Sequence, residues 1–192
     1  VRDRIGTSLK RFQPVLSSAK ARDVNESDTV VIITDILEHV FGYDKYADIT
    51  SEHSIRSTFC DLAIKVDGDL AFLIEAKAIG LELKDQHVKQ AIDYAANQGV
   101  EWVCLTNGVD WRIYKVFFTK PINFETVAEF SVLNLSHKKE EDIDLLGLLA
   151  KDGWKKGELE QYNSVREVLN RFNVGAILLS DAVIRVVRKQ IR

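Results

Sequence analysis

The sequence has few of the residues that mark several large classes of protein. Its 192 residues include only two cysteines, Cys60 and Cys104, and both lie in apolar runs, which argues against a disulfide framework or a zinc site. No apolar run reaches membrane-spanning length, and we expect no signal peptide. The net charge is -3, so nucleic-acid binding would need a local basic patch. We therefore expect a cytoplasmic protein that has no membrane partner.

Methionine is absent, which indicates that the native N-terminus lies before Val1. The hydrophobic fraction of 46% and the charged fraction of 29% are ordinary for a globular protein, and the length suffices for one core with an appendage. The basic helical pattern that ends at Arg192 has no stop signal, which leaves a continuation of the chain open.

Periodicity predicts two helices in the first half of the chain. Asn25 is a good N-cap, and apolar residues at helical spacing follow it, so we expect a helix over about 27–41 that stops at Gly42. A second amphipathic pattern predicts a helix over 81–98, which Gly99 ends.

Strands are predicted on both sides of the second helix. Residues 58–77 form two apolar runs around Asp67-Gly68, a strong hairpin signal. Shorter strands are expected at 49–52, 102–105, 111–117 and 130–135. The passage from strand to helix to strand between Leu70 and Leu105 implies a right-handed crossover and a parallel pair, so the fold class is α/β with a mixed sheet flanked by helices.

We divide the chain into three parts. Residues 1–24 are basic and contain Pro14, and they form an arm or a helix. Residues 25–135 form the α/β domain. Residues 136–192 are a helical C-terminal region, in which a capping box at Ser164 predicts the start of one helix and 181–192 form another.

The ends of the predicted hairpin carry a constellation of charged residues. Asp61 lies near the start of the first strand, and the second strand ends on Glu75-Ala76-Lys77. Since side chains on a strand alternate between faces, Glu75 and Lys77 point the same way. Two carboxylates and a lysine at adjacent strand ends can hold a divalent cation and stabilise a charged phosphate, which is the chemistry of a metal-dependent phosphodiesterase.

The order of these elements resembles the PD-(D/E)xK nuclease fold, and more narrowly the N-terminal nuclease domain of type I restriction enzyme R subunits. Over about 25–114, the stretches that carry the resemblance are Asn25-Glu26-Ser27-Asp28-Thr29, Phe41-Gly42-Tyr43-Asp44, Asp61 with Ile74-Glu75-Ala76-Lys77, Gln90-x-x-x-Tyr94, and Leu105-Thr106-Asn107-Gly108 with Trp111. The proline that usually precedes the first acid is replaced by Cys60. A P-loop is missing, so the chain is a stand-alone relative of the R subunit or a piece of one.

The resemblance implies a restriction-endonuclease-like fold and Mg²⁺- or Mn²⁺-dependent hydrolysis of DNA in restriction or defence. Asp61, Glu75 and the backbone carbonyl of Ala76 would bind the metal, and Lys77 would position the attacking water or stabilise the transition state. Gln90 would orient the water or a phosphate oxygen.

Further implied roles are auxiliary. Tyr94 would bind the DNA backbone, and Glu26 would approach the metal. Other subunits of a restriction system are further expected partners.

Each of these residues also has a structural interpretation. Glu75 and Lys77 can form a simple surface pair, and Gln90 and Tyr94 can flank an amphipathic helix. The basic stripe of Arg185, Arg188 and Lys189 can bind phosphates or can be a solvated face. The main functional alternative is a catalytically inactive nuclease-fold module that binds nucleic acid or a partner protein. No pattern in the sequence indicates an oligomeric state.

Overall fold

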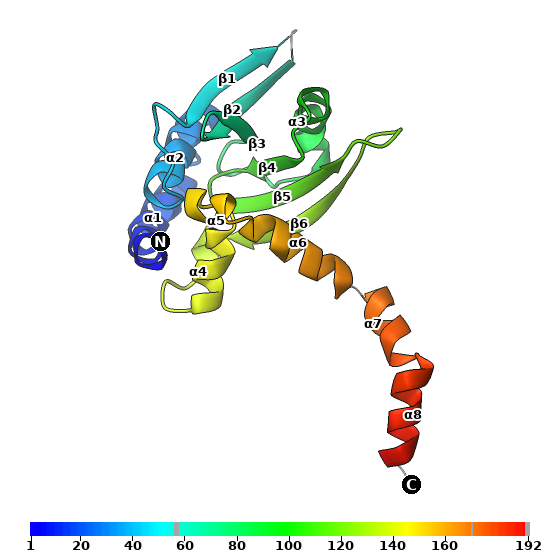
Figure 1. Cartoon of the computed structure of the whole chain (residues 1–192). Helices are drawn as coiled ribbons and strands as arrows, with labels where there is room; N and C mark the ends of the chain where they lie inside the picture. The colour runs from blue at the N-terminus through cyan, green and yellow to red at the C-terminus, as the bar shows by residue number, and fades with distance from the viewer. Residues whose placement is uncertain (56–57, 170, 191–192) are drawn as a thin grey trace.

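A single mixed sheet forms the centre of the protein. The structure is a computed structural model that describes residues 1–55, 58–169 and 171–190. Within these residues, six strands are hydrogen-bonded in the order β1-β2-β3-β4-β5-β6 (Figure 1). Their bounds are Ile49–Ile55, Thr58–Val66, Asp69–Ala76, Trp102–Thr106, Asp110–Phe117 and Asn123–Ser131. The predicted α/β class with a mixed sheet is confirmed.

The predicted hairpin and crossover are both present. Strands β2 and β3 are antiparallel, with Leu62 opposite Ile74, and Asp67 and Gly68 turn the chain at φ 54° and 95°. Helix α3 (Asp85–Gln98) then carries the chain to β4, which runs parallel to β3. The start of β2 therefore lies beside the ends of β3 and β4, where the site described below is found.

Each face of the sheet is covered by its own set of helices. On one face, α3 packs against a cluster that includes Ala63, Leu73, Val103 and Tyr114. On the other face, α1 (Arg2–Ala21) and α2 (Glu26–His39) pack against strand residues of the opposite parity, such as Leu62, Ile74 and Trp111. The alternation of the strands therefore divides the apolar residues between two layers.

The two N-terminal helices follow their sequence signals. The Asn25 side chain accepts a hydrogen bond from the backbone N–H of Asp28 at 2.9 Å, which caps α2 as predicted. Residues 1–24 are mostly the helix α1, and Pro14 lies inside it. The apolar side of α1 is part of the main core; its buried residues are Ile5, Leu9, Phe12, Leu16 and Ala19.

Three predicted boundaries are wrong. The helix expected over 81–98 begins only at Asp85. Residues 81–84 belong to a loop, in which the Leu81 carbonyl accepts a hydrogen bond from the Asn107 side chain. The strand expected at 130–135 lies earlier, as β6, and Val132–Asn134 form a 3-10 turn. Ser164 does not start a helix, since α6 (Glu158–Val168) runs through it after a left-handed residue at Gly157.

The C-terminal region is helical. Its first part packs on the body, where Ile143, Leu146 and Leu149 belong to the main core, and its later part extends away as an arm (Figure 1). The region contains α4 (Glu140–Gly147), α5 (Lys151–Lys155), α6, α7 (Arg171–Leu178) and α8 (Asp181–Gln190). The predicted helix over 181–192 is confirmed as far as Gln190, and residues 191 and 192 lie outside the described residues. None of the described helices is long and apolar enough to cross a membrane.

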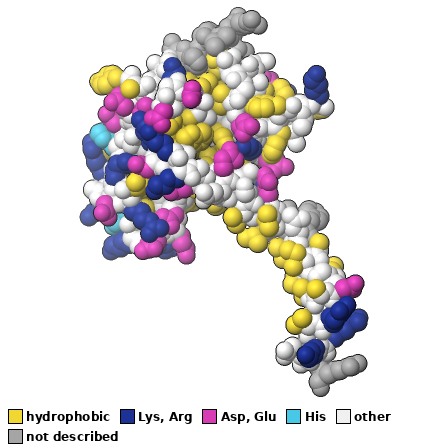
Figure 2. Space-filling model, viewed as in Figure 1, with side chains coloured by type: hydrophobic (Ala, Val, Ile, Leu, Met, Phe, Trp, Pro, Cys, Tyr) yellow, Lys and Arg dark blue, Asp and Glu magenta, His cyan; other side chains and the backbone are white. Residues whose placement is uncertain are grey.

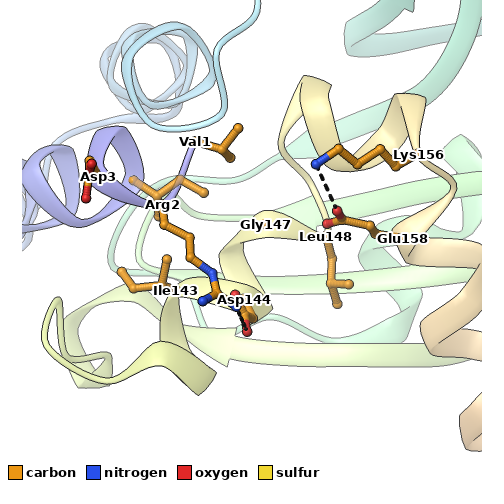
Figure 3. Close-up of a pocket in the computed structure, with 10 residues that line it drawn as sticks. Val1, Arg2, Asp3, Ile143, Asp144, Gly147, Leu148, Lys156 and Glu158 are labelled. Atoms are coloured by element: carbon orange, nitrogen blue, oxygen red, sulfur yellow. Dashed lines mark hydrogen bonds and ion pairs between the residues drawn. The ribbon is translucent and has the colours of Figure 1, made fainter.

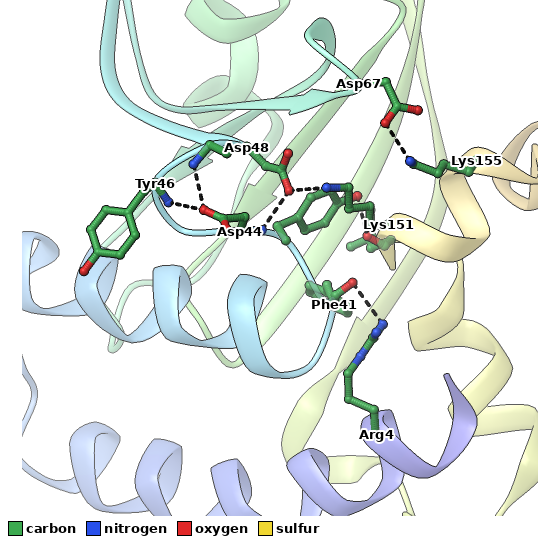
Figure 4. Close-up of polar contacts among 11 residues, drawn as sticks. Arg4, Phe41, Asp44, Tyr46, Asp48, Asp67, Lys151 and Lys155 are labelled. Atoms are coloured by element: carbon green, nitrogen blue, oxygen red, sulfur yellow. Dashed lines mark hydrogen bonds and ion pairs between the residues drawn. The ribbon is translucent and has the colours of Figure 1, made fainter.

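A polar network joins the connection between α2 and β1 to α5 (Figure 4). The Asp48 carboxylate accepts hydrogen bonds from Lys151 Nζ at 2.5 Å and from the backbone N–H of Asp44 at 2.7 Å. The Tyr43 hydroxyl donates to the carbonyl of Leu149 at 2.9 Å. The helical C-terminal region is thereby attached to the segment that leads into the sheet.

Candidate metal-binding and catalytic site

Asp61 and Glu75 lie on the same face of the sheet. Along β2, Asp61 has the parity of Ala63, and along β3, Glu75 has the parity of Leu73; both apolar residues belong to the α3 side. The pairing of Leu62 with Ile74, continued by one residue, sets Asp61 across from Glu75. The two carboxylates therefore approach each other at the end of the hairpin opposite its turn.

Direct contacts connect Asp61 to the backbone of Ala76, and Glu75 to Lys77. The backbone N–H of Ala76 donates to Asp61 Oδ2 at 2.6 Å, so Asp61 holds the end of β3. Lys77 Nζ donates to Glu75 Oε1 at 2.7 Å and lies 3.6 Å from Glu26 Oε2. Glu26 stands in the first turn of α2, far from the strands in sequence. Two carboxylates, those of Glu75 and Glu26, thus contact the Lys77 ammonium from elements far apart in the sequence.

Burial and neighbouring charges shift the pKa values of the central pair. The side chains of Glu75 and Lys77 are only 13% and 18% exposed. Burial raises the pKa of Glu75, and the charges of Asp61 and Glu26 raise it further, against the lowering effect of Lys77. For Lys77, burial lowers the pKa, but Glu75, Glu26 and Asp61 outweigh it and the net shift is upward. A cation near the carboxylates would relieve their mutual repulsion.

The Glu75→Gln variant should gain stability relative to the wild type as the pH rises. Since the folded-state pKa of Glu75 lies above its ordinary value of 4.5, its stabilising contribution is present below that pH and is lost as the pH rises through the folded value. Glutamine does not titrate, so the difference in unfolding free energy should grow in the variant's favour as the pH rises above the ordinary value of 4.5. Urea unfolding in EDTA measures it, and a difference that does not change with pH would contradict the shift.

Gln90 and Tyr94 lie on α3 in different environments. Gln90 is exposed, and in the described part of the chain no hydrogen bond joins it to the Glu75–Lys77 pair. Tyr94 is 1% exposed and belongs to the core cluster between α3 and the sheet, together with Cys60, the residue before Asp61. The structure therefore brings Asp61, Glu75, Lys77 and Glu26 together, whereas among the described residues no hydrogen bond joins Gln90 to them.

The basic residues predicted to contact nucleic acid lie at the far end of the arm. Arg185, Arg188 and Lys189 are exposed on α8, and Figure 2 shows basic side chains gathered there beside an apolar strip. They are separate from the acidic cluster, so a shared role would require a long ligand.

Among the residues that sequence analysis left without a site role, Thr106 and Asn107 contact the site region. The backbone N–H of Lys77 donates to the Thr106 carbonyl at 2.8 Å, and Asn107 Nδ2 donates to the Leu81 carbonyl at 2.9 Å. The Thr106-Asn107-Gly108 motif was visible in the sequence. Its hydrogen bonds, however, join residues that are distant along the chain, which spacing alone does not reveal.

The donor set suits a metal that keeps several waters. Among the described residues, no group of three or more His, Cys, Asp or Glu side chains could hold a metal ion. The available set is instead two neighbouring carboxylates with a main-chain carbonyl. Mg²⁺ is commonly bound in this way, through one or two carboxylates and retained water, so the residues present fit this ion.

A separate pocket of about 680 Å³ lies between the start of α1 and helices α4 to α6 (Figure 3). Two of its charged pairs are internal: Arg2 with Asp144 at 2.8 Å and Lys156 with Glu158 at 3.7 Å. Its lining contains none of the acidic residues of the strand ends. Its charges balance one another and point to no ligand.

Comparison with known proteins gives one family match. Residues 31–130, just over half of the chain, match the family described as type I restriction enzyme R protein N terminus (HSDR_N). No curated protein matches the chain, and no solved structure matches it. The matched segment contains Asp61, Glu75 and Lys77, and the six-stranded mixed sheet flanked by helices fits a restriction-endonuclease-like fold. The chain therefore belongs to the family of type I restriction enzyme R protein N-terminal domains.

Proposed function

We propose that this chain is a metal-dependent endonuclease domain that hydrolyses DNA phosphodiester bonds in restriction or defence. The observation that supports it best is the cluster of charged residues on β2 and β3. There Asp61 accepts a hydrogen bond from the Ala76 backbone N–H, and Lys77 Nζ lies 2.7 Å from Glu75 and 3.6 Å from Glu26. The family membership points to the same restriction-related, nuclease-like module.

In this proposal, Asp61, Glu75 and the Ala76 carbonyl bind Mg²⁺ or Mn²⁺. The bound ion would lower the pKa of a water molecule and neutralise charge on the phosphate. The hydrogen bond from the Ala76 amide to Asp61 would preorganise the site, because it holds the Asp61 carboxylate beside the peptide group that follows Glu75. Glu26, whose carboxylate lies 3.6 Å from Lys77 Nζ, would add negative charge that favours a divalent cation nearby.

Lys77 acts on the reacting groups. Its ammonium is held by Glu75 on a largely buried side chain, so it would orient the attacking water or face the phosphate with little loss of side-chain entropy. Gln90 is exposed on α3 and would have to reach the substrate once DNA is bound.

DNA and other subunits of a restriction system are the proposed partners, and the cytoplasm is the proposed compartment. The DNA backbone would contact Tyr94 only after movement of the buried ring. Arg185, Arg188 and Lys189 would add phosphate contacts on a long substrate.

Metal binding and cleavage test the proposal together. Wild-type protein should bind Mn²⁺ in calorimetry and should cut plasmid DNA with Mg²⁺ or Mn²⁺ but not with EDTA. Asp61→Asn should weaken Mn²⁺ binding at least about tenfold and lose cleavage, since it removes a charged ligand. The variant is well matched because the asparagine carbonyl can still accept from the Ala76 amide.

The main alternative has a distinct signature. If the wild type binds no Mn²⁺ and leaves plasmid and single-stranded DNA intact, the nuclease proposal is wrong. Retardation of DNA on a gel under those conditions would then support an inactive nuclease-fold module that binds nucleic acid.

A further inference from the structure

The chain between β4 and β5 forms a turn that is bonded within itself, the 106–111 turn. Asn107 Oδ1 accepts hydrogen bonds from the backbone N–H groups of Val109 at 3.1 Å and Asp110 at 2.7 Å. Thr106 Oγ1 donates to the Asp110 carbonyl and accepts from the Gly108 amide, and Trp111 Nε1 donates to the Gly108 carbonyl. Thr106 and Asn107 are 0% and 2% exposed, so the turn is a rigid, buried element.

Two bonds connect the 106–111 turn to the chain around Lys77. The Thr106 carbonyl accepts from the backbone N–H of Lys77 at 2.8 Å. Asn107 Nδ2 donates to the Leu81 carbonyl at 2.9 Å, within the loop of residues 78–84 that follows Lys77 directly. The amide orientation of Asn107 is fixed, because a flipped side chain would place its NH₂ group against two backbone donors.

The same turn lies close to the helix that carries Glu26. Gly108 has φ +82°, and a Cβ built on it would lie 3.6 Å from a methyl group of Thr29 and 3.4 Å from one of Leu16. Thr29 follows Glu26 by three residues on α2. The 106–111 turn therefore lies between the end of β3 and the start of α2. These two elements carry Lys77 and Glu26, whose charged groups meet.

We propose that Asn107 is a positioning residue that holds Lys77 in place by tethering the loop of residues 78–84 to the 106–111 turn. The backbone of Lys77 joins β3 to this loop. Loss of the hydrogen bond between Asn107 and the Leu81 carbonyl would let the loop, and with it Lys77, change direction. The catalytic consequence rests on the proposed nuclease function, whereas the tether itself does not.

Asn107→Asp isolates the tether. Aspartate keeps an oxygen that accepts from Val109 and Asp110, so the turn retains its internal bonds. It has no NH₂ donor for Leu81, and its carboxylate faces that carbonyl oxygen without a shared proton. Asn107→Ala, which loses both sets of bonds, is the comparison for a general disruption of the turn.

Amide hydrogen exchange of metal-free protein by NMR measures the tether without any need for activity. In Asn107→Asp, the amides of Lys77 and Leu81 should exchange at least about tenfold faster, while the amide of Val103, near the start of β4, should keep its rate. Unchanged exchange at Lys77 would overturn the proposal. Faster exchange at Val103 as well would also overturn it, because the residue would then support the whole fold.

Steady-state cleavage measures the catalytic part. Asn107→Asp should lower kcat about tenfold to hundredfold with KM for DNA within about twofold, at an unchanged folded fraction by circular dichroism. An unchanged kcat would overturn the catalytic role. If wild type itself neither cuts DNA nor binds Mn²⁺, the proposed function fails while the exchange rates still decide the tether.

Discussion

Replacing Lys77 by alanine is expected to lower the rate of DNA cleavage by about 10²- to 10³-fold while DNA binding remains. The Lys77 side chain is 18% exposed, and its ammonium is bonded to Glu75 and lies 3.6 Å from Glu26, so alanine removes the positive charge that these two carboxylates face. Charge stabilisation is worth most where water is largely excluded, which is why the effect on the rate is large. Single-turnover plasmid cleavage with excess enzyme measures the loss apart from product release.

Lys10→Ala is the matched control, because it removes an exposed lysine from α1 and leaves the acidic cluster intact. It should cut DNA at the wild-type rate. A gel-shift assay in Ca²⁺ should show that Lys77→Ala still retards the same DNA. If Lys77→Ala cuts as fast as the wild type, the lysine has no part in the reaction and the metal would have to act without it.

The parts of the fold that the sequence predicts are those with local signals. Asp67-Gly68 between two apolar runs predicts the hairpin, and the Asn25 cap predicts the start of α2. The sequence predicts the start of α3 too early, because Leu83 continues the helical apolar pattern although it lies in a loop. Leu83 is buried in the core cluster beside α3. The sequence predicts β6 too late, because Glu125 and Glu129 interrupt the apolar pattern of the strand.

The candidate site divides in the same way. Asp61, Glu75 and Lys77 follow from two adjacent strands and their alternation, so the sequence can bring them together. The contact between Glu26 and Lys77 joins elements 51 positions apart, and only the family resemblance indicated it. The tether from Asn107 to Leu81 spans 26 positions between a turn and a loop, and no periodicity describes such a bond.

The largest expected loss of stability outside the apolar core is at Lys151. Its Nζ lies 2.5 Å from Asp48, whose side chain is only 9% exposed (Figure 4). The Lys151 backbone N–H donates to the Phe41 carbonyl. Lys151→Met keeps the length of the side chain and the backbone bond but leaves the buried carboxylate without its cation. The free energy of unfolding should fall by about 3 kcal/mol, as measured by urea denaturation.

Lys155 provides a matched control on the same helix. It pairs with Asp67 at 2.6 Å, but the two side chains are 44% and 68% exposed, so Lys155→Met should cost less than about 1 kcal/mol. The double variant Asp48→Asn/Lys151→Met removes both charges of the buried pair. It should be less destabilised than the sum of its single variants by roughly 1–3 kcal/mol, because much of the single cost is the unpaired charge itself. If Lys151→Met costs no more than Lys155→Met, water reaches Asp48 and the pair contributes no more than a surface contact.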